Sequence, residues 1–202
     1  MNYPLFEKMI SLEYLFESWY AFRRGKRKKL DVQIFERHLE DNIFSLRDEL
    51  ASCEYKHGPY FQFDVFDPKR RFISAASVRD RLVHQMVFSL LSDVFEKRFI
   101  FHSFSSRLGK GTHLGCDFLK RMLLKASQNG SQDCYALKMD VRRFFANVDQ
   151  ALLKQLLQKA IGDEKMLEIT DIIIDSFQTE GAEKIGLPLG NVTTPTTMLQ
   201  TI

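Results

Sequence analysis

The stretch Leu137-Lys138-Met139-Asp140-Val141-Arg142-Arg143-Phe144-Phe145-Ala146-Asn147-Val148-Asp149 joins a hydrophobic run to a carboxylate and a pair of aromatic residues. Its weak alternation predicts a buried strand over residues 135–141. Such a strand would hold Asp140 rigidly, and a carboxylate is a ligand that suits Mg²⁺. The two aromatic residues could wall a pocket beside the metal. The alternative, which the spacing alone favours, is that Asp140 only caps the following turn.

Upstream of this stretch the pattern predicts a β-hairpin with a cationic tip. Residues 60–66 and 70–74 read as strands, and Asp67-Pro68-Lys69 is a turn signal. The cations Lys69, Arg70 and Arg71 could hold a triphosphate if the hairpin folds over a cleft. Charges on a hairpin tip are more often simply solvated, so this alternative stays open.

Downstream lies Gly186-Leu187-Pro188-Leu189-Gly190, a loop in which glycines permit close backbone approach to a ligand and proline stiffens the chain. By itself this pattern is also typical of any tight turn between two elements.

Helical periodicity dominates the remaining chain, and with the hairpin it predicts the α+β class. Asp31 and Asp149 are placed to cap two of the helices. Between the third and fourth helices, a loop over residues 102–112 carries Arg107 and Lys110. The predicted helices cover residues 4–23, 31–50, 77–97, 113–126, 149–159 and 164–178.

The charge distribution is more informative than the net charge of +3. A cationic block is a candidate surface for a polyanion, although a solvated helix exit is the commoner explanation of such a run. The block consists of Arg23, Arg24, Lys26, Arg27, Lys28 and Lys29.

Composition excludes several classes of protein. The three cysteines form no CxxC pair, which argues against a zinc site and suits a reducing compartment. The chain has no run of eighteen apolar residues and no signal-like N-terminus. We therefore expect a soluble cytoplasmic protein without a membrane span.

The order of the segments is more specific than any one of them. A basic hairpin, a helix, a loop with Arg and Lys-Gly, Asp-x-x-x-Phe-Phe and then Gly-x-Pro-x-Gly follow one another as in reverse transcriptases. The chain resembles this family of RNA-directed DNA polymerases over about residues 30–193, with similar motifs at 72–85, 104–113, 137–149 and 186–193. Retroviral and group II intron enzymes usually have Gln where this chain has Leu189. The Leu form, with the basic block, is similar to the enzymes of diversity-generating retroelements.

The resemblance implies fingers plus a partial palm of a right-hand polymerase. It suggests an N-terminal helix and basic extension over residues 1–30, fingers over 31–134 and a partial palm over 135–202. Members of the family add deoxynucleotides to a DNA primer on an RNA template, using two metal ions.

The resemblance also assigns roles to single residues. Asp140 would hold both Mg²⁺ ions, and the Val141 carbonyl would help with one. Phe145 would lie under the sugar and reject a 2′-hydroxyl, while Leu189 and Gly190 would line the nucleotide pocket. Lys69 and Arg71 would hold the incoming deoxynucleoside triphosphate, with Arg70 standing where the family usually has Pro. Arg107, Lys110 and the basic block would contact RNA phosphates.

The chain departs from the family in two ways. It contains no Tyr-x-Asp-Asp, and residues 194–202, with one Pro and four Thr, replace the usual apolar helix. Since Asp140 alone cannot hold two metals well, we expect a truncated chain that does not polymerise by itself. The alternatives are a non-catalytic RNA-binding module and an inert truncated product. The sequence predicts no particular protein partner.

Overall fold

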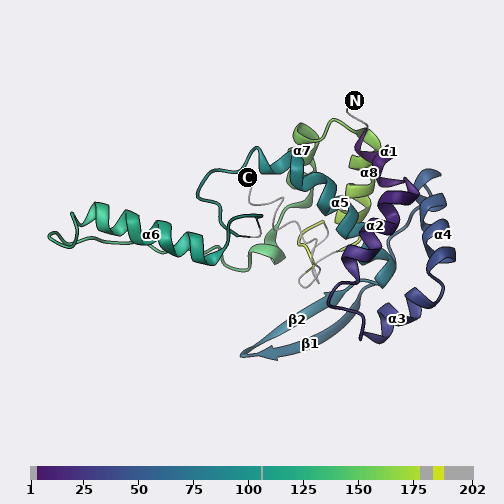
Figure 1. The fold of residues 1–202 in the computed structure, drawn as a ribbon, viewed down its shortest axis with the longest axis horizontal. Coiled ribbons are helices and arrows are strands. Elements are labelled where there is room, and N and C mark those ends of the chain that lie inside the picture. Colours follow the sequence, from purple (N-terminus) through teal and green to yellow (C-terminus); the bar gives the residue numbers. More distant parts are fainter. Residues whose placement is uncertain (1–3, 106, 178–183, 189–202) are drawn as a thin grey trace.

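The computed structural model describes residues 4–105, 107–177 and 184–188, without the side chains of Asp67, Lys69 and Arg71. It confirms the α+β class, because the described residues form helices and one small antiparallel sheet (Figure 1). The elements in chain order are α1 (Leu5–Met9), α2 (Leu12–Phe22), α3 (Leu30–Arg37), α4 (Leu39–Ala51), β1 (Phe61–Asp67), β2 (Lys69–Ala75), α5 (Val78–Glu96), α6 (Thr112–Ala126), the 3₁₀ helix η1 (Phe144–Asn147), α7 (Gln150–Ala160) and α8 (Glu164–Asp175).

Helix α5 lies at the centre of the body and contacts α1, α2, α3 and α8 (Figure 1). Ser77 caps its first turn by accepting a hydrogen bond from the Asp80 amide. Its apolar stripe of Val78, Leu82, Met86 and Leu90 is buried, as are large side chains of the helices around it, Trp19 among them. The helical periodicity therefore located the hydrophobic core correctly.

The predicted helix over residues 4–23 is two helices, because a serine interrupts it. The Ser11 hydroxyl donates to the Lys8 carbonyl (2.8 Å) and accepts from the Tyr14 amide (3.4 Å). It thereby ends α1 and caps the start of α2.

The predicted helix over residues 31–50 is also divided, at His38, which has non-helical φ/ψ of −122° and 43°. The Asn42 side-chain amide donates to the Phe35 carbonyl (2.9 Å) and satisfies a group at the end of α3. The prediction that Asp31 caps this helix is wrong. Lys29 is the N-cap residue, and Asp31 lies in the first turn, where it forms an ion pair with Arg81.

The hairpin of β1 and β2 is confirmed and projects from the body (Figure 1). Its register pairs Phe61 with Ala75 at the base and Asp67 with Lys69 at the tip. Neither face of its outer half is fully covered, since Phe66 on one face is 73% exposed and Val65 on the other is 38% exposed.

The predicted buried strand over residues 135–141 is absent. These residues form no regular element, and the side chains of Tyr135, Leu137, Met139 and Val141 are 65–92% exposed. A strand exists only through hydrogen bonds to a neighbour, and no described residue pairs with this segment. Asp140 therefore lies on an exposed segment and not at the end of a buried strand.

Helix α6 projects from the body as an arm, and the chain turns at its tip and returns (Figure 1). None of its residues is buried. Across the part of the chain that the structure describes, no helix is both long and apolar enough to cross a bilayer.

Candidate functional site

The structure brings two predicted motifs together although they lie about forty residues apart in the sequence. The Leu187 amide donates to the Phe145 carbonyl and the Gly186 amide donates to the Val148 carbonyl, both at 2.8 Å. An isolated antiparallel bridge continues this pairing between Asp149 and Ile185. Gly186 has a φ of +97°, which disfavours a side chain. Leu189 and Gly190 lie outside the described residues.

The Gln150 side chain stabilises the pairing of residues 145–149 with residues 185–187. The sequence did not predict this role. This side chain is 2% exposed, and its amide nitrogen donates to the Gly186 carbonyl (3.0 Å) and to the Phe177 carbonyl (2.7 Å). It follows Asp149, which caps α7 as predicted by accepting from the Leu152 amide. In the sequence, a buried glutamine directly after an N-cap residue looks the same as an exposed glutamine at that position, so no pattern could have indicated its role.

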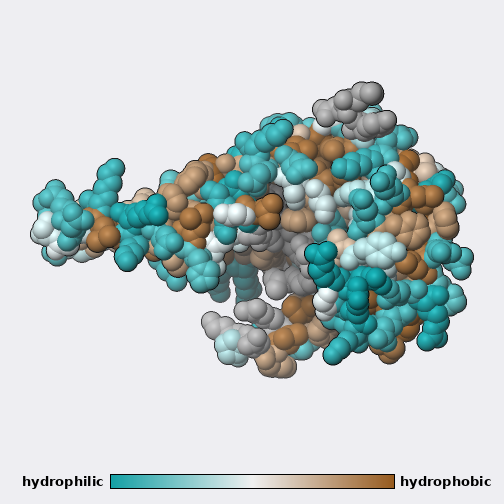
Figure 2. Space-filling model, viewed as in Figure 1, coloured by the Kyte–Doolittle hydropathy of each residue, from teal (hydrophilic) through white to brown (hydrophobic). Residues whose placement is uncertain are grey.

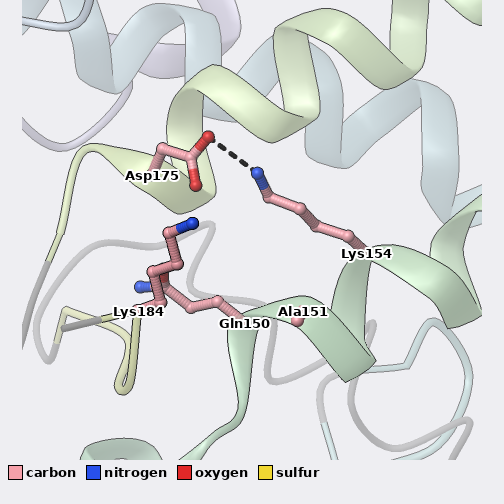
Figure 3. Close-up of a pocket in the computed structure, with 5 residues that line it drawn as sticks. All are labelled: Gln150, Ala151, Lys154, Asp175 and Lys184. Carbon is pink, nitrogen blue, oxygen red and sulfur yellow. Dashed lines mark hydrogen bonds and ion pairs between the residues drawn. The ribbon is translucent and has the colours of Figure 1, made fainter.

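A pocket of about 270 Å³ opens behind the pairing (Figure 3). Gln150, Lys154, Asp175 and Lys184 point into it, and the Lys154 ammonium lies 2.7 Å from the Asp175 carboxylate. The pKa of the neighbouring Asp171 is raised, chiefly by burial and also by the negative charge of Asp175. The Lys154 ammonium, 3.7 Å from the Asp171 carboxylate, acts in the opposite direction and lowers this pKa. The charge of Lys154 is thus largely balanced, and the pocket by itself is no strong anion site.

An aromatic contact ties the base of the hairpin to the same region. The Tyr60 hydroxyl lies 2.8 Å from the Ser176 hydroxyl, and its ring meets the Phe177 ring edge-on at 5.8 Å. Burial raises the pKa of Tyr60 to about 12, so the phenol stays protonated. Since the Phe177 carbonyl accepts from Gln150, a continuous set of contacts joins the hairpin to the Phe145 pairing.

Asp80 anchors the segment that leads into the hairpin. It is 1% exposed and accepts hydrogen bonds from the Tyr55 hydroxyl (2.9 Å), the Ser77 hydroxyl (2.7 Å) and the Gly58 amide (3.2 Å). A Cβ at Gly58 would lie 3.0 Å from the Asp80 carboxylate, which explains the glycine. Arg79 adds an ion pair at 3.3 Å. The motif at residues 72–85 thus has a structural role in supporting the hairpin.

Two stacked histidines continue this network. The His57 Nδ1 lies 2.6 Å from the Gly58 carbonyl, which can only accept, so Nδ1 carries the proton. The His57 Nε2 then accepts from the His84 Nε2 at 3.0 Å. The remaining His84 Nδ1 is a buried lone pair without a partner among the described residues. Burial keeps the His84 ring neutral.

The buried His84 makes stability depend on pH. Burial, and then the neighbouring His57, lower the pKa of His84 from 6.5 to about 3. Below pH 6.5 the unfolded chain binds a proton that the folded chain excludes, so stability falls as pH falls towards 3. We expect the free energy of unfolding to fall by roughly 1.4 kcal/mol per pH unit from this group. Urea unfolding at about pH 7 and about pH 5 should show a smaller difference for His84→Leu than for the unchanged chain.

The matched control for that comparison is His38→Gln, because His38 is exposed. An unchanged pH dependence in His84→Leu would contradict a neutral buried His84.

Asp140 and Val141 are both exposed and lie ahead of η1. Within the described residues, no group of three or more His, Cys, Asp or Glu side chains could hold a metal ion. Asp140 can offer one carboxylate and Val141 one carbonyl, whereas a two-metal centre needs further carboxylates. The described residues therefore do not build a two-metal site by themselves.

The hairpin cations differ in what the structure shows of them. Arg70 forms a two-bond ion pair with Asp64 (2.9 and 2.8 Å), and this pairing lowers the pKa of Asp64. The Arg70 side chain is 69% exposed and that of Asp64 is 29% exposed, so the pair lies at the surface and can open to a ligand at little cost. Lys69 and Arg71 lie in β2, and their side chains are outside the described set.

The side chains of Arg107 and Lys110 both donate hydrogen bonds to carbonyls of the neighbouring segment 100–103. The Arg107 guanidinium donates to Glu96 and to the carbonyls of Ile100 (3.0 Å) and Ser103 (2.9 Å), which leaves at most one free N–H. Lys110 donates to the Phe101 carbonyl (2.8 Å) and lies 3.7 Å from the Phe101 ring centroid.

This geometry favours a structural role for Arg107 over a phosphate contact. We expect Arg107→Lys to lower the midpoint of thermal unfolding by several degrees, because lysine cannot reproduce the forked donor geometry. The salt dependence of RNA binding should not change. Arg98→Lys is the control, since Arg98 is exposed and makes one long contact. An unaltered midpoint with a shallower salt dependence would instead assign Arg107 to phosphate binding.

Within the basic block the six cations fall into two groups. Arg23 forms an ion pair with Glu36, and Lys26 lies 4.0 Å from the Phe22 ring centroid, with a pKa lowered first by burial and then by Arg81. The other four are exposed, and their side chains form no ion pair with described residues; we call them the basic turn. The basic turn consists of Arg24, Arg27, Lys28 and Lys29.

No protein-family model matches the chain. Among curated proteins it is similar to the COX1/OXI3 intron 1 protein of Saccharomyces cerevisiae, with 22% identity over 157 residues. That match covers 74% of this chain and 18% of the yeast protein. The chain therefore spans less than a fifth of the length of this relative.

The chain shares its fold with solved structures, among them chains of two complexes. The chain matches a partial Cas6-RT-Cas1–Cas2 complex and a Cas6-RT-Cas1–Cas2 complex, each with a TM-score of 0.58, 15% sequence identity and 99% of this chain covered. The matches span 33% and 21% of those chains. RT abbreviates reverse transcriptase, so the resemblance to that family drawn from the sequence motifs is confirmed at the level of fold.

Proposed function

We propose that the chain is the template- and nucleotide-binding part of an RNA-directed DNA polymerase of the reverse transcriptase type. Residues 31–134 would be its fingers, and the partial palm would begin at residue 135. The observation that carries this proposal is the backbone pairing of Phe145 with Leu187, which unites two motifs that the family resemblance had indicated separately.

In this proposal Phe145 supports the sugar of an incoming deoxynucleoside triphosphate. Its ring is half-buried beside Phe144, with ring centroids 5.5 Å apart. Packing against Phe144 and the Leu187 hydrogen bond would limit its movement, so a 2′-hydroxyl would meet a stiff apolar wall. Lys69, Arg70 and Arg71 would supply the cations for the triphosphate, and Leu189 and Gly190 would lie near the base.

Mg²⁺ would be held through Asp140 and the Val141 carbonyl. A bound ion would stabilise charge on the phosphates. Because no carboxylate cluster surrounds Asp140 among the described residues, we derive no catalytic step from this chain alone.

The test is primer extension on an RNA template annealed to a DNA primer. We expect the chain to bind this hybrid at low salt and to add no nucleotide with Mg²⁺ present. Extension that is lost in Asp140→Ala would contradict the expected inactivity. Failure to bind the hybrid or single-stranded RNA at any low salt concentration would contradict the proposed function itself.

A second candidate is a non-catalytic RNA-binding module, and the exposed basic turn favours it. Binding would then depend on the basic turn and be indifferent to Asp140→Ala and Phe145→Ala. Under the polymerase proposal, Phe145→Ala should instead weaken the preference for deoxyribonucleotides over ribonucleotides in equilibrium dialysis.

A further inference from the structure

The junction between the hairpin and the Phe145 pairing is internal, unlike the α6 arm, whose apolar and hydrophilic side chains lie at the surface (Figure 2). The central side chain of this junction, Gln150, is 2% exposed and donates to carbonyls of two other segments of the described chain. A ligand cannot touch a side chain buried to this extent. Any effect of Gln150 on a ligand must therefore pass through the groups that it holds.

Gln150 is attached by its backbone and by its side chain to the segment that pairs with Phe145. Its backbone amide donates to the Lys184 carbonyl (3.2 Å), and its side-chain nitrogen donates to the Gly186 carbonyl (3.0 Å). The following amide, that of Leu187, donates to the Phe145 carbonyl (2.8 Å). The Phe145 backbone is therefore held by a segment that Gln150 clamps at two points.

The same side-chain nitrogen also reaches towards the hairpin. It donates to the Phe177 carbonyl (2.7 Å), and the Phe177 ring meets the Tyr60 ring edge-on at 5.8 Å. Tyr60 lies one residue before β1, and its hydroxyl is 2.8 Å from that of Ser176. A primary amide carries two N–H donors on one nitrogen. One side chain thus ties both segments together, which a carboxylate of the same shape could not do.

We propose that Gln150 is a positioning residue for nucleotide selection, which keeps the aromatic wall of Phe145 and the base of the hairpin in one relative position. This inference rests on the proposed function, in which Phe145 faces the sugar and the hairpin cations hold the triphosphate. One element then fixes the nucleotide at its phosphates and the other meets it at its sugar. Rejection of a 2′-hydroxyl requires a constant distance between the two, and a wall that shifts by about 1 Å loses much of its selectivity.

The first test measures the affinities for a deoxyribonucleoside triphosphate and for the matching ribonucleoside triphosphate by equilibrium dialysis. The chain is bound to an RNA template annealed to a DNA primer that ends in a dideoxynucleotide, so that no nucleotide can be added. We expect Gln150→Met, which keeps the side-chain length and removes both donors, to reduce the ratio of the two affinities by roughly fivefold or more. A loss of stability alone would weaken both nucleotides alike and leave the ratio unchanged.

Gln158→Met is the matched control, because Gln158 lies exposed on the same helix α7. Tyr60→Phe removes the hydroxyl contact with Ser176 and keeps the ring, so it should reduce the ratio in the same direction as Gln150→Met. Phe145→Ala removes the wall itself. Adding Gln150→Met to Phe145→Ala should therefore change the ratio no further, because the two side chains act through one another.

The second test needs no nucleotide. In the free chain, Gln150→Met should speed hydrogen exchange of the Gly186 and Leu187 amides by roughly tenfold or more, because the clamp on their segment is lost. The amides of α5 should exchange as before, which separates this local change from general unfolding.

An unchanged ratio of affinities in Gln150→Met would overturn the proposal, as would an equal reduction in Gln158→Met. Additive effects of Gln150→Met and Phe145→Ala would do the same, since Gln150 would then not act through the wall. Unaltered exchange at Gly186 and Leu187 would overturn the clamp whether or not a nucleotide binds. A chain that binds neither nucleotide nor the hybrid would instead contradict the proposed function, and this inference with it.

Discussion

A chain in which Arg24, Arg27, Lys28 and Lys29 are replaced by glutamine will bind single-stranded RNA on the order of 100-fold more weakly at about 0.1 M salt. The reason is that these four side chains are exposed and unpaired with the described residues, so each is available to a phosphate. Each lost contact should also reduce the slope of log affinity against log salt by about 0.7. Fluorescence anisotropy with a labelled oligonucleotide, over a series of salt concentrations, measures both quantities.

A variant with the same change in net charge serves as the control. Lys97, Lys120, Lys125 and Lys159 are exposed and lie outside the basic turn. Their replacement by glutamine should leave most of the affinity and the slope intact. Equal losses in the two variants would show that net charge, and not the basic turn, governs RNA binding.

Asp80→Ala will lower the free energy of unfolding by roughly 3–5 kcal/mol. The carboxylate is buried and accepts from Tyr55, Ser77 and Gly58, so its removal leaves these donors without an acceptor next to the cation of Arg79. The segment that leads into the hairpin would lose its anchor at the same time. Urea unfolding followed by circular dichroism measures the change.

Asp48→Ala is the matched control for Asp80→Ala. The Asp48 side chain is 69% exposed, and its ion pair with Arg47 is solvated, so its loss should cost less than about 1 kcal/mol. A loss as small as this in Asp80→Ala would show that the hydrogen bonds around Asp80 contribute little net stability.

The candidate site was predictable in part. The order of motifs indicated a reverse-transcriptase-like chain, and the structural likeness confirms it. The joining of Phe145 to Leu187 agrees with that resemblance. The predicted RNA contacts of Arg107 and Lys110 remain untested predictions, and the structure shows both side chains engaged in their own loop.

The sequence by itself determined the elements that depend on local patterns. These include the apolar stripe of α5, the hairpin of β1 and β2 and the Asp149 cap of α7. Helical hydrogen bonds, turn residues and caps act over a few positions, so their signals are present in any short window of the chain.

Only the tertiary structure decided the features that need distant partners. Residues 135–141 have the pattern of a strand but no described neighbour to pair with, so Asp140 is exposed. Gln150 and Asp80 became central because folding brought carbonyls or donors from other segments to them. A side chain's own residue type does not specify which distant groups will reach it, and burial then makes those contacts strong and their absence costly.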